Sequence, residues 1–359
     1  MNKRKLLLYP YDITSLHFLQ YSEVFTNNLI VEVVSPAGWG YVGKDAGDSV
    51  GIRTGVMVTN DFDAALSKVD GILLVESIYE LDEDTFSFSI QKALEVKKEV
   101  ITARKFEREL LEKYRHDISN LYTQEKINIQ VKADKTLVNR IKKPIVVVMG
   151  SGDRCNKFDI QLIVRDIFMR YGYNVTQIGS KGFSNYYGFY SFPEFVFDKN
   201  IDLSEKVIQF NHYISYLDKS ETSDVIILGV PGGISPYDEK YNNGFGEINY
   251  IVSNAINADY VIFSSIFTDY AQKYFTSLPE ILKYKFNYEL DSVFLSNAYV
   301  NWDATNDLQS LIYTTLDKTF VSDAATNIGV YSIYDDSHVS AFEKKLIETL
   351  GGYGDYEEL

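Results

Sequence analysis

Residues 142–162 read KKPIVVVMGSGDRCNKFDIQL, the most informative stretch of this sequence for its architecture. Pro144 precedes a β-branched run that ends at Gly150, which predicts a buried strand. A glycine-containing loop follows. Apolar residues then recur at the spacing of a helix face until Gly172, namely Ile160, Ile163, Ile167, Phe168 and Tyr171. The order strand, glycine loop, helix is the opening of a parallel α/β sheet.

The loop between this strand and this helix is a candidate phosphate-binding loop. Its amides and the first-turn N–H groups point at one spot, and the helix dipole favours an anion there. Against the pattern G-x-x-x-x-G-K-[ST], only Lys157 matches, because Ser151 and Asn156 stand at the glycine positions and Phe158 at the hydroxyl position. The predicted phosphate-binding residues are Gly150, Ser151, Gly152, Asp153, Arg154, Cys155, Asn156, Lys157 and Phe158.

A second loop follows the apolar strand DVIIL at residues 224–228, and its predicted site residues are Gly229, Pro231, Gly232, Gly233, Tyr237 and Asp238. If the two strands are parallel neighbours, both loops meet at one end of the sheet. The usual Mg²⁺ positions are unfilled, which leaves Asp153 or Asp238 as substitute ligands, and no metal site is predicted. Lys181 is a candidate second cation near the phosphates, and the favoured alternative is a lone loop lysine that is merely solvated. The alternative is a tight turn with an exposed Lys157.

The whole chain of 359 residues predicts two doubly wound parallel-sheet α/β domains, the second a degenerate P-loop NTPase-like fold. Apolar runs alternating with helical stretches predict a Rossmann- or flavodoxin-like domain over residues 1–115. Residues 116–142 are polar and predict a linker. The P-loop NTPase-like domain covers residues 143–351, with a strand expected at 328–334, and residues 352–359 predict a frayed tail.

Charge and cysteine content exclude several classes of function. The net charge is −15, with −3 on residues 1–140 and −12 on residues 141–359, so nucleic-acid binding is disfavoured. Cys155 is the single cysteine and the apolar run near the N-terminus is short, which predicts a cytoplasmic protein with no membrane span. The four histidines are dispersed, which gives no support to a zinc site or a catalytic triad.

Two further features have alternative interpretations. Cys155 lies at a helix N-terminus, where a thiol pKa falls, but no histidine is adjacent in sequence, which favours a packing role over a nucleophile. The aromatic segment FSNYYGFYSF at residues 183–192 can clamp a peptide or stack on a base. We expect instead a loop that folds back over the sheet.

Several long motifs, GSGDRCNKFDIQL, GFYSFPEFVF, DVIILGVPGG, NNGFGEINY, INADYVIFSS and YKFNYELD, resemble the family of bacterial peptide maturation system proteins. These are encoded beside radical-SAM enzymes and short bacteriocin-like precursor peptides. The resemblance implies an accessory protein in the maturation of a ribosomally made peptide (a RiPP), with the precursor peptide and a radical-SAM enzyme as partners.

The second domain is also similar to the phosphate-loop fold of dethiobiotin synthetase, where ATP activates a small carboxylate. This likeness implies ATP or GTP as ligand and leaves Mg²⁺ open, because its usual ligands are missing. It assigns no catalytic residue and leaves open whether the protein is an enzyme. The alternative function is a non-catalytic scaffold that presents the precursor peptide to a modifying enzyme.

Overall fold

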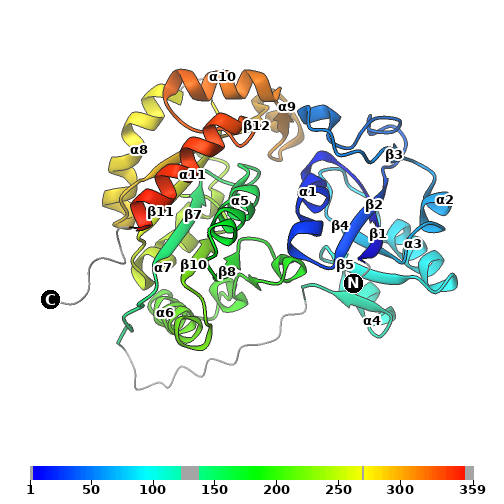
Figure 1. Cartoon of the computed structure of the whole chain (residues 1–359), viewed down its shortest axis with the longest axis horizontal. Helices are drawn as coiled ribbons and strands as arrows, with labels where there is room; N and C mark the ends of the chain where they lie inside the picture. The colour runs from blue at the N-terminus through cyan, green and yellow to red at the C-terminus, as the bar shows by residue number, and fades with distance from the viewer. Residues whose placement is uncertain (1–2, 123–136, 269–270, 352–359) are drawn as a thin grey trace. The chain divides into compact units, whose positions relative to one another are not determined.

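The chain divides into two compact α/β units (Figure 1). The computed structural model describes residues 3–122, 137–268 and 271–351. The first unit comprises Met1–Lys126 with Gly182–Ser191, and the second comprises Ile127–Lys181 with Phe192–Leu359. Each unit contains one mostly parallel sheet, so the predicted α/β class with two such sheets is confirmed. No helix in the described ranges is long and apolar enough to cross a membrane.

The sheet of the first unit has the order β3-β2-β1-β4-β5-β6, and all of its pairings are parallel. This is the Rossmann order, in which the chain winds outward in both directions from β1. The strands are β1 (Arg4–Tyr9), β2 (Asn28–Val34), β3 (Val58–Thr59), β4 (Gly71–Val75), β5 (Glu99–Ala103) and β6 (Ile118–Asn120).

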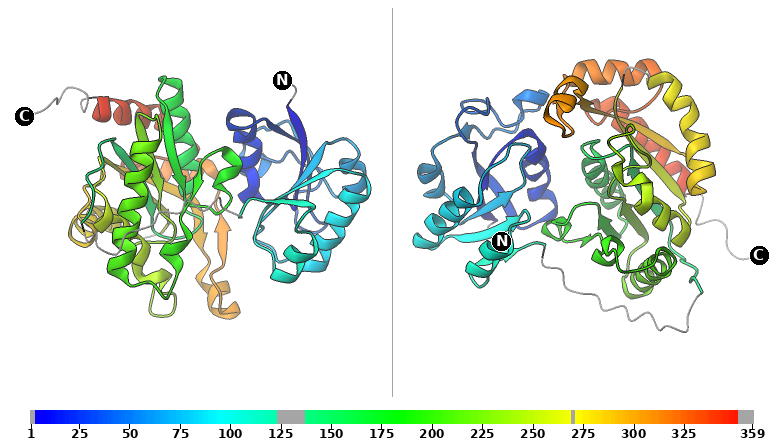
Figure 2. Two further views of the ribbon diagram at one scale, coloured as in Figure 1. Left: turned by 90° about the horizontal axis from the view of Figure 1, so that it is seen from below. Right: turned by 180° about the vertical axis from the view of Figure 1, so that it is seen from behind.

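Helices cover both faces of this sheet, as Figure 2 shows. One face carries α2 (Phe62–Leu66), α3 (Glu83–Glu95) and α4 (Arg108–Lys113), whose apolar residues share a core with alternate strand residues such as Leu7 and Leu74. The other carries α1 (Leu16–Phe25). Coverage on both faces explains the continuous apolar strands, since neither side of such a strand meets water.

The sheet of the second unit has the order β13-β12-β11-β7-β10-β8-β9, and β13 is antiparallel to β12. Its strands are β7 (Ile145–Gly150), β8 (Val175–Gly179), β9 (Tyr190–Ser191), β10 (Val225–Gly229), β11 (Tyr260–Phe267), β12 (Ser292–Val300) and β13 (Tyr313–Thr315). The helices are α5 (Lys157–Arg170), α6 (Leu203–Ser220), α7 (Glu247–Ala255), α8 (Ala271–Phe286), α9 (Trp302–Leu308), α10 (Lys318–Ile328) and α11 (Asp336–Gly351). Helices α5 and α11 share one core with β7, β10 and β11.

The structure corrects two of the predicted segments. The polar segment 116–142 is not all linker, because residues 118–120 pair with β5 as the edge strand β6. The strand expected at residues 328–334 is wrong: α10 runs to Ile328, Gly329 ends it with a φ of 73°, and only a bridge between Phe294 and Tyr331 follows. Glycine tolerates that backbone conformation, so the helix ends where a strand was expected. Residues 352–359, the predicted tail, lie outside the described ranges.

The rings of the aromatic segment that contact α1 do not cover the second sheet, and only its residues Tyr190 and Ser191, as β9, belong to that sheet. We call Gly182–Ser191 the aromatic arm, because its rings pack within the first unit. Phe183 lies 5.2 Å from Phe18 between ring centroids, and the Tyr187 hydroxyl lies 2.7 Å from Nδ1 of His17. Tyr186 bonds Ser22 on the same helix, α1. The predicted second domain is therefore not continuous: ten of its residues complete the core of the first unit.

Candidate phosphate-binding site

The two predicted loops meet at one end of the second sheet. Strands β7 and β10 are parallel neighbours, so the segments that follow them leave the sheet side by side. Nζ of Lys157 donates to the carbonyl of Gly232, and Nδ2 of Asn243 donates to the carbonyl of Ser151 at 2.8 Å. The alternative with an exposed lysine is wrong, since Lys157 is only 7% exposed and faces the second loop.

In the first loop, the backbone carbonyls and the backbone N–H groups differ in their hydrogen bonding. Its carbonyls accept bonds from the protein: Ser264 Oγ donates to Cys155, Ser296 Oγ to Arg154 at 3.2 Å, and the Cys155 thiol to Gly152 at 3.1 Å. Within the described residues, the amides of Gly152, Asp153, Arg154, Asn156 and Lys157 have no acceptor. Carbonyls tied on one side and amides open on the other make a backbone nest for an anion.

Asn156 departs from the phosphate-loop pattern in residue type but not in conformation. Its φ of 58° and ψ of 17° lie in the left-handed region that the pattern's glycine usually occupies. Asparagine is among the residues that tolerate this region best, so the chain still turns sharply into α5. Asn156 therefore adopts a backbone conformation that glycine also adopts readily.

Close approach explains two glycines of the site, one from each loop. A Cβ on Gly152 would overlap the Tyr237 hydroxyl, and one on Gly233 would overlap the amide of Asn243. Larger residues at either position would force the two loops apart. The predicted glycines are thus required by packing between the loops.

Lys157 is held in an unusual electrostatic environment. Burial lowers the pKa of its ammonium group, the charges of Cys155 and Asp153 raise it, and the charge of Lys181 lowers it. This electrostatic effect alone does not place Lys181 at the phosphates, so its role as a second cation stays a prediction. Cys155 is buried and packs with Ile266 and neighbouring apolar residues, the surroundings of a packing residue.

The positions that usually hold Mg²⁺ do not fit it here. Phe158 is buried where a hydroxyl is expected. Gly229 and Val230 stand where the strand before the second loop usually ends in an aspartate in related nucleotide-binding domains, and a Cβ on Gly229 would overlap the side chain of Gln161. Asp238 is exposed and accepts the amides of Lys240 and Tyr241 within its own turn. Among the described residues, no group of three His, Cys, Asp or Glu side chains can hold a metal ion.

Residues distant in sequence complete the site. The guanidinium carbon of Arg154 lies 5.0 Å from the ring centroid of Tyr313 on β13. The Tyr313 hydroxyl lies 3.4 Å from that of Tyr237. Tyr313, Ser264 and Ser296 were not predicted, and no local pattern marks them. Ser264 lies on β11 beside Gly150, where β7 ends, and Ser296 lies in the middle of β12, so only the pairing of the strands brings these two serines to the loop.

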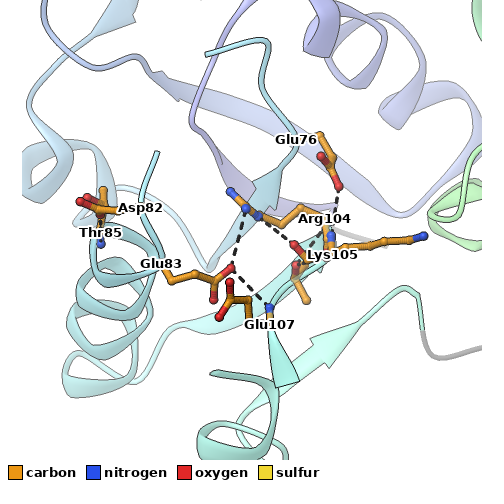
Figure 3. Close-up of polar contacts among 8 residues, drawn as sticks. Glu76, Asp82, Glu83, Thr85, Arg104, Lys105 and Glu107 are labelled. Atoms are coloured by element: carbon orange, nitrogen blue, oxygen red, sulfur yellow. Dashed lines mark hydrogen bonds and ion pairs between the residues drawn. The ribbon is translucent and has the colours of Figure 1, made fainter. Parts of the chain in front are cut away.

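Figure 3 shows a second group of polar side chains, in the first unit where β4 and β5 end. The guanidinium of Arg104 stacks 3.7 Å from the ring of Phe86, and its Nη2 lies 3.9 Å from Oε1 of Glu83. Burial lowers the pKa of Arg104, while the charges of Glu76 and Glu83 raise it. The same Glu83 oxygen accepts the amide of Glu107 at 3.4 Å. This group ties the start of α3 to the start of α4.

Comparisons with known proteins report on the fold. No family model matches the chain, and no curated protein matches it. Among solved structures, the chain is similar to a DUF1611 family protein from Anabaena variabilis, with a TM-score of 0.62 and 10% sequence identity. The match covers 97% of this chain and 99% of that one. At this identity the likeness shows that the chain shares the α/β fold of that protein.

Proposed function

We propose that the second unit binds ATP, GTP or another phosphorylated ligand at the loops that follow β7 and β10. One observation supports this proposal above all. The carbonyls of the first loop accept hydrogen bonds from the protein, whereas several of its N–H groups have no acceptor among the described residues. A phosphate seated there receives several N–H donors at the start of α5 and the favourable end of its dipole.

Lys157 supplies the charge for such a ligand. Its ammonium group now donates to the Gly232 carbonyl, a neutral acceptor. A phosphate oxygen is the stronger acceptor, because hydrogen bonds between charged partners are roughly twice as strong as neutral ones. We therefore expect Lys157 to exchange Gly232 for the ligand, with Lys181 as a second cation nearby.

We propose further that the protein acts in the cytoplasm as an accessory protein in the maturation of a ribosomally made peptide. The support is the resemblance of its motifs to the peptide maturation system proteins, strongest over residues 143–296. The partners would be the precursor peptide and a radical-SAM enzyme. Co-expression of the tagged chain with both products of its own gene neighbourhood, followed by purification, tests this role. Failure to co-purify either product contradicts it.

Calorimetry with ATP and with GTP tests the ligand. We expect Lys157→Met to weaken binding more than tenfold, because a charge-assisted contact contributes about 1.5–3 kcal/mol. Lys143→Met is the matched control, since Lys143 also donates to a backbone carbonyl, that of Glu221 at 2.6 Å, but ahead of the start of β7. Equal loss in both variants would contradict a specific role for Lys157.

The second candidate function is a non-catalytic scaffold that presents the precursor peptide. It is favoured by one observation: the ammonium group of Lys157 already has a hydrogen-bond acceptor within the protein, the carbonyl of Gly232. This candidate predicts that neither nucleotide binds and that the precursor peptide still does.

A further inference from the structure

Phosphate-loop proteins usually neutralise their ligand with Mg²⁺, and this chain has closed both positions that hold the ion. The buried ring of Phe158 replaces the hydroxyl ligand. The side chain of Gln161 fills the space that a carboxylate at position 229 would need. Its Nε2 donates to the Lys157 carbonyl at 2.9 Å and to Ser180 Oγ at 3.0 Å, so Gln161 is fixed in that place.

Protein cations gather at the same loop instead. Lys157 projects from the first turn of α5, and Lys181 acts on it electrostatically. Arg154 is exposed, and within the described residues no carboxylate lies within 4.0 Å of it. A guanidinium in this state has its fork of donors available to an anion.

Arg154 is also held in place beside the loop amides. Its carbonyl accepts Ser296 Oγ at 3.2 Å, and its guanidinium lies over the ring of Tyr313. Tyr313 in turn meets Tyr237, which contacts Gly152. A cation fixed in this way loses less freedom when it binds an anion than a free surface arginine does.

We propose that Arg154, together with Lys157, neutralises the phosphates in place of Mg²⁺, so that this site binds a nucleoside di- or triphosphate without a metal ion. The inference rests on the proposed function of the same loop. Residues 141–359 carry a net charge of −12, which repels long polyanions such as nucleic acids. A small phosphate ligand contacts only the local cations, so the site selects small phosphates over polyanions.

Calorimetry on the unmodified protein, with ATP in EDTA and with ATP in excess Mg²⁺, gives the first test. We expect the two dissociation constants to agree within about threefold. Binding that requires Mg²⁺ would overturn the inference and leave the proposed function standing. No binding in either buffer would overturn the proposed function, and the inference with it.

Two variants give the second test, in EDTA. Arg154→Gln should weaken ATP binding about tenfold. The control Arg108→Gln, at a largely exposed position on α4, should leave binding unchanged. An Arg154→Gln affinity equal to that of the control would overturn the inference.

A substitution of Asp153 distinguishes neutralisation by protein cations from neutralisation by a metal ion, because the two predict opposite changes in ATP affinity. It is the exposed carboxylate of the loop and lies within electrostatic range of Lys157. If protein cations hold the phosphates, Asp153→Asn removes a repulsive charge and tightens ATP binding by roughly two- to fivefold. If Asp153 holds a metal ion, the same change weakens binding in Mg²⁺, which would contradict the proposal.

Discussion

Phe183 is 165 residues from Phe18 in sequence, yet its truncation should destabilise the first unit. Its side chain is 5% exposed, stacks on His17 at 5.7 Å and lies 5.2 Å from Phe18 between ring centroids. Removal of a buried phenylalanine ring costs about 3–5 kcal/mol. Because the free energy of unfolding of a domain is only about 5–15 kcal/mol, Phe183→Ala should remove a large part of the stability of this unit.

Hydrogen exchange locates that loss. If the arm is part of the first unit, the amides of α1 should exchange roughly a hundredfold or more faster in Phe183→Ala, since each 1.4 kcal/mol is a factor of ten. Phe197→Ala is the matched control, because Phe197 follows the arm but is 51% exposed and should change little. Unchanged protection of α1, or faster exchange confined to α5, would refute the assignment of the arm to the first unit.

We expect three further outcomes at other positions. Gly152→Ala should destabilise the protein, because the new methyl group overlaps the Tyr237 hydroxyl, and its melting temperature measures this. Asn156→Gly should be tolerated, whereas Asn156→Val should cost about 1–2 kcal/mol in urea unfolding, because valine resists the left-handed conformation. Although burial raises the pKa of Asp45, bonds from Thr54 and neighbouring amides lower it to about 2. Its stabilising effect is therefore complete above its ordinary pKa and should be lost as the pH falls from about 4 to 2, visible as faster exchange at residues 45–55.

The meeting of the two loops could be predicted because it follows from topology. Parallel neighbouring strands send their connections to one edge, so Lys157 and Gly232 had to approach although 75 residues separate them. The conformation of Asn156 could not be predicted from the pattern, which names glycine. Backbone angle, rather than residue type, is what the loop requires.

The partners of the aromatic residues could not be predicted. Aromatic rings bury large areas but have only a weak preference for the direction of packing. The sequence of residues 183–192 therefore predicts that the segment is packed, but it does not identify the element against which it packs. Tyr313 was missed for the same reason, since nothing near it in sequence points to Arg154. The boundary predicted at residue 143 rests only on the order of elements along the chain. The arm follows that boundary in sequence, so this prediction places it in the second domain.

The discontinuity of the first unit imposes an order on its synthesis. Met1–Lys126 leaves the ribosome before the arm exists, and the unit cannot be completed until Ser191 is translated, 65 residues later. During that interval α1 exposes Phe18 and the other side chains that the arm later covers. The arm of another nascent copy fits the same face, which is the starting point of a domain-swapped dimer. Fast translation of codons 127–191 shortens this exposure and so favours the monomeric pairing of arm and helix.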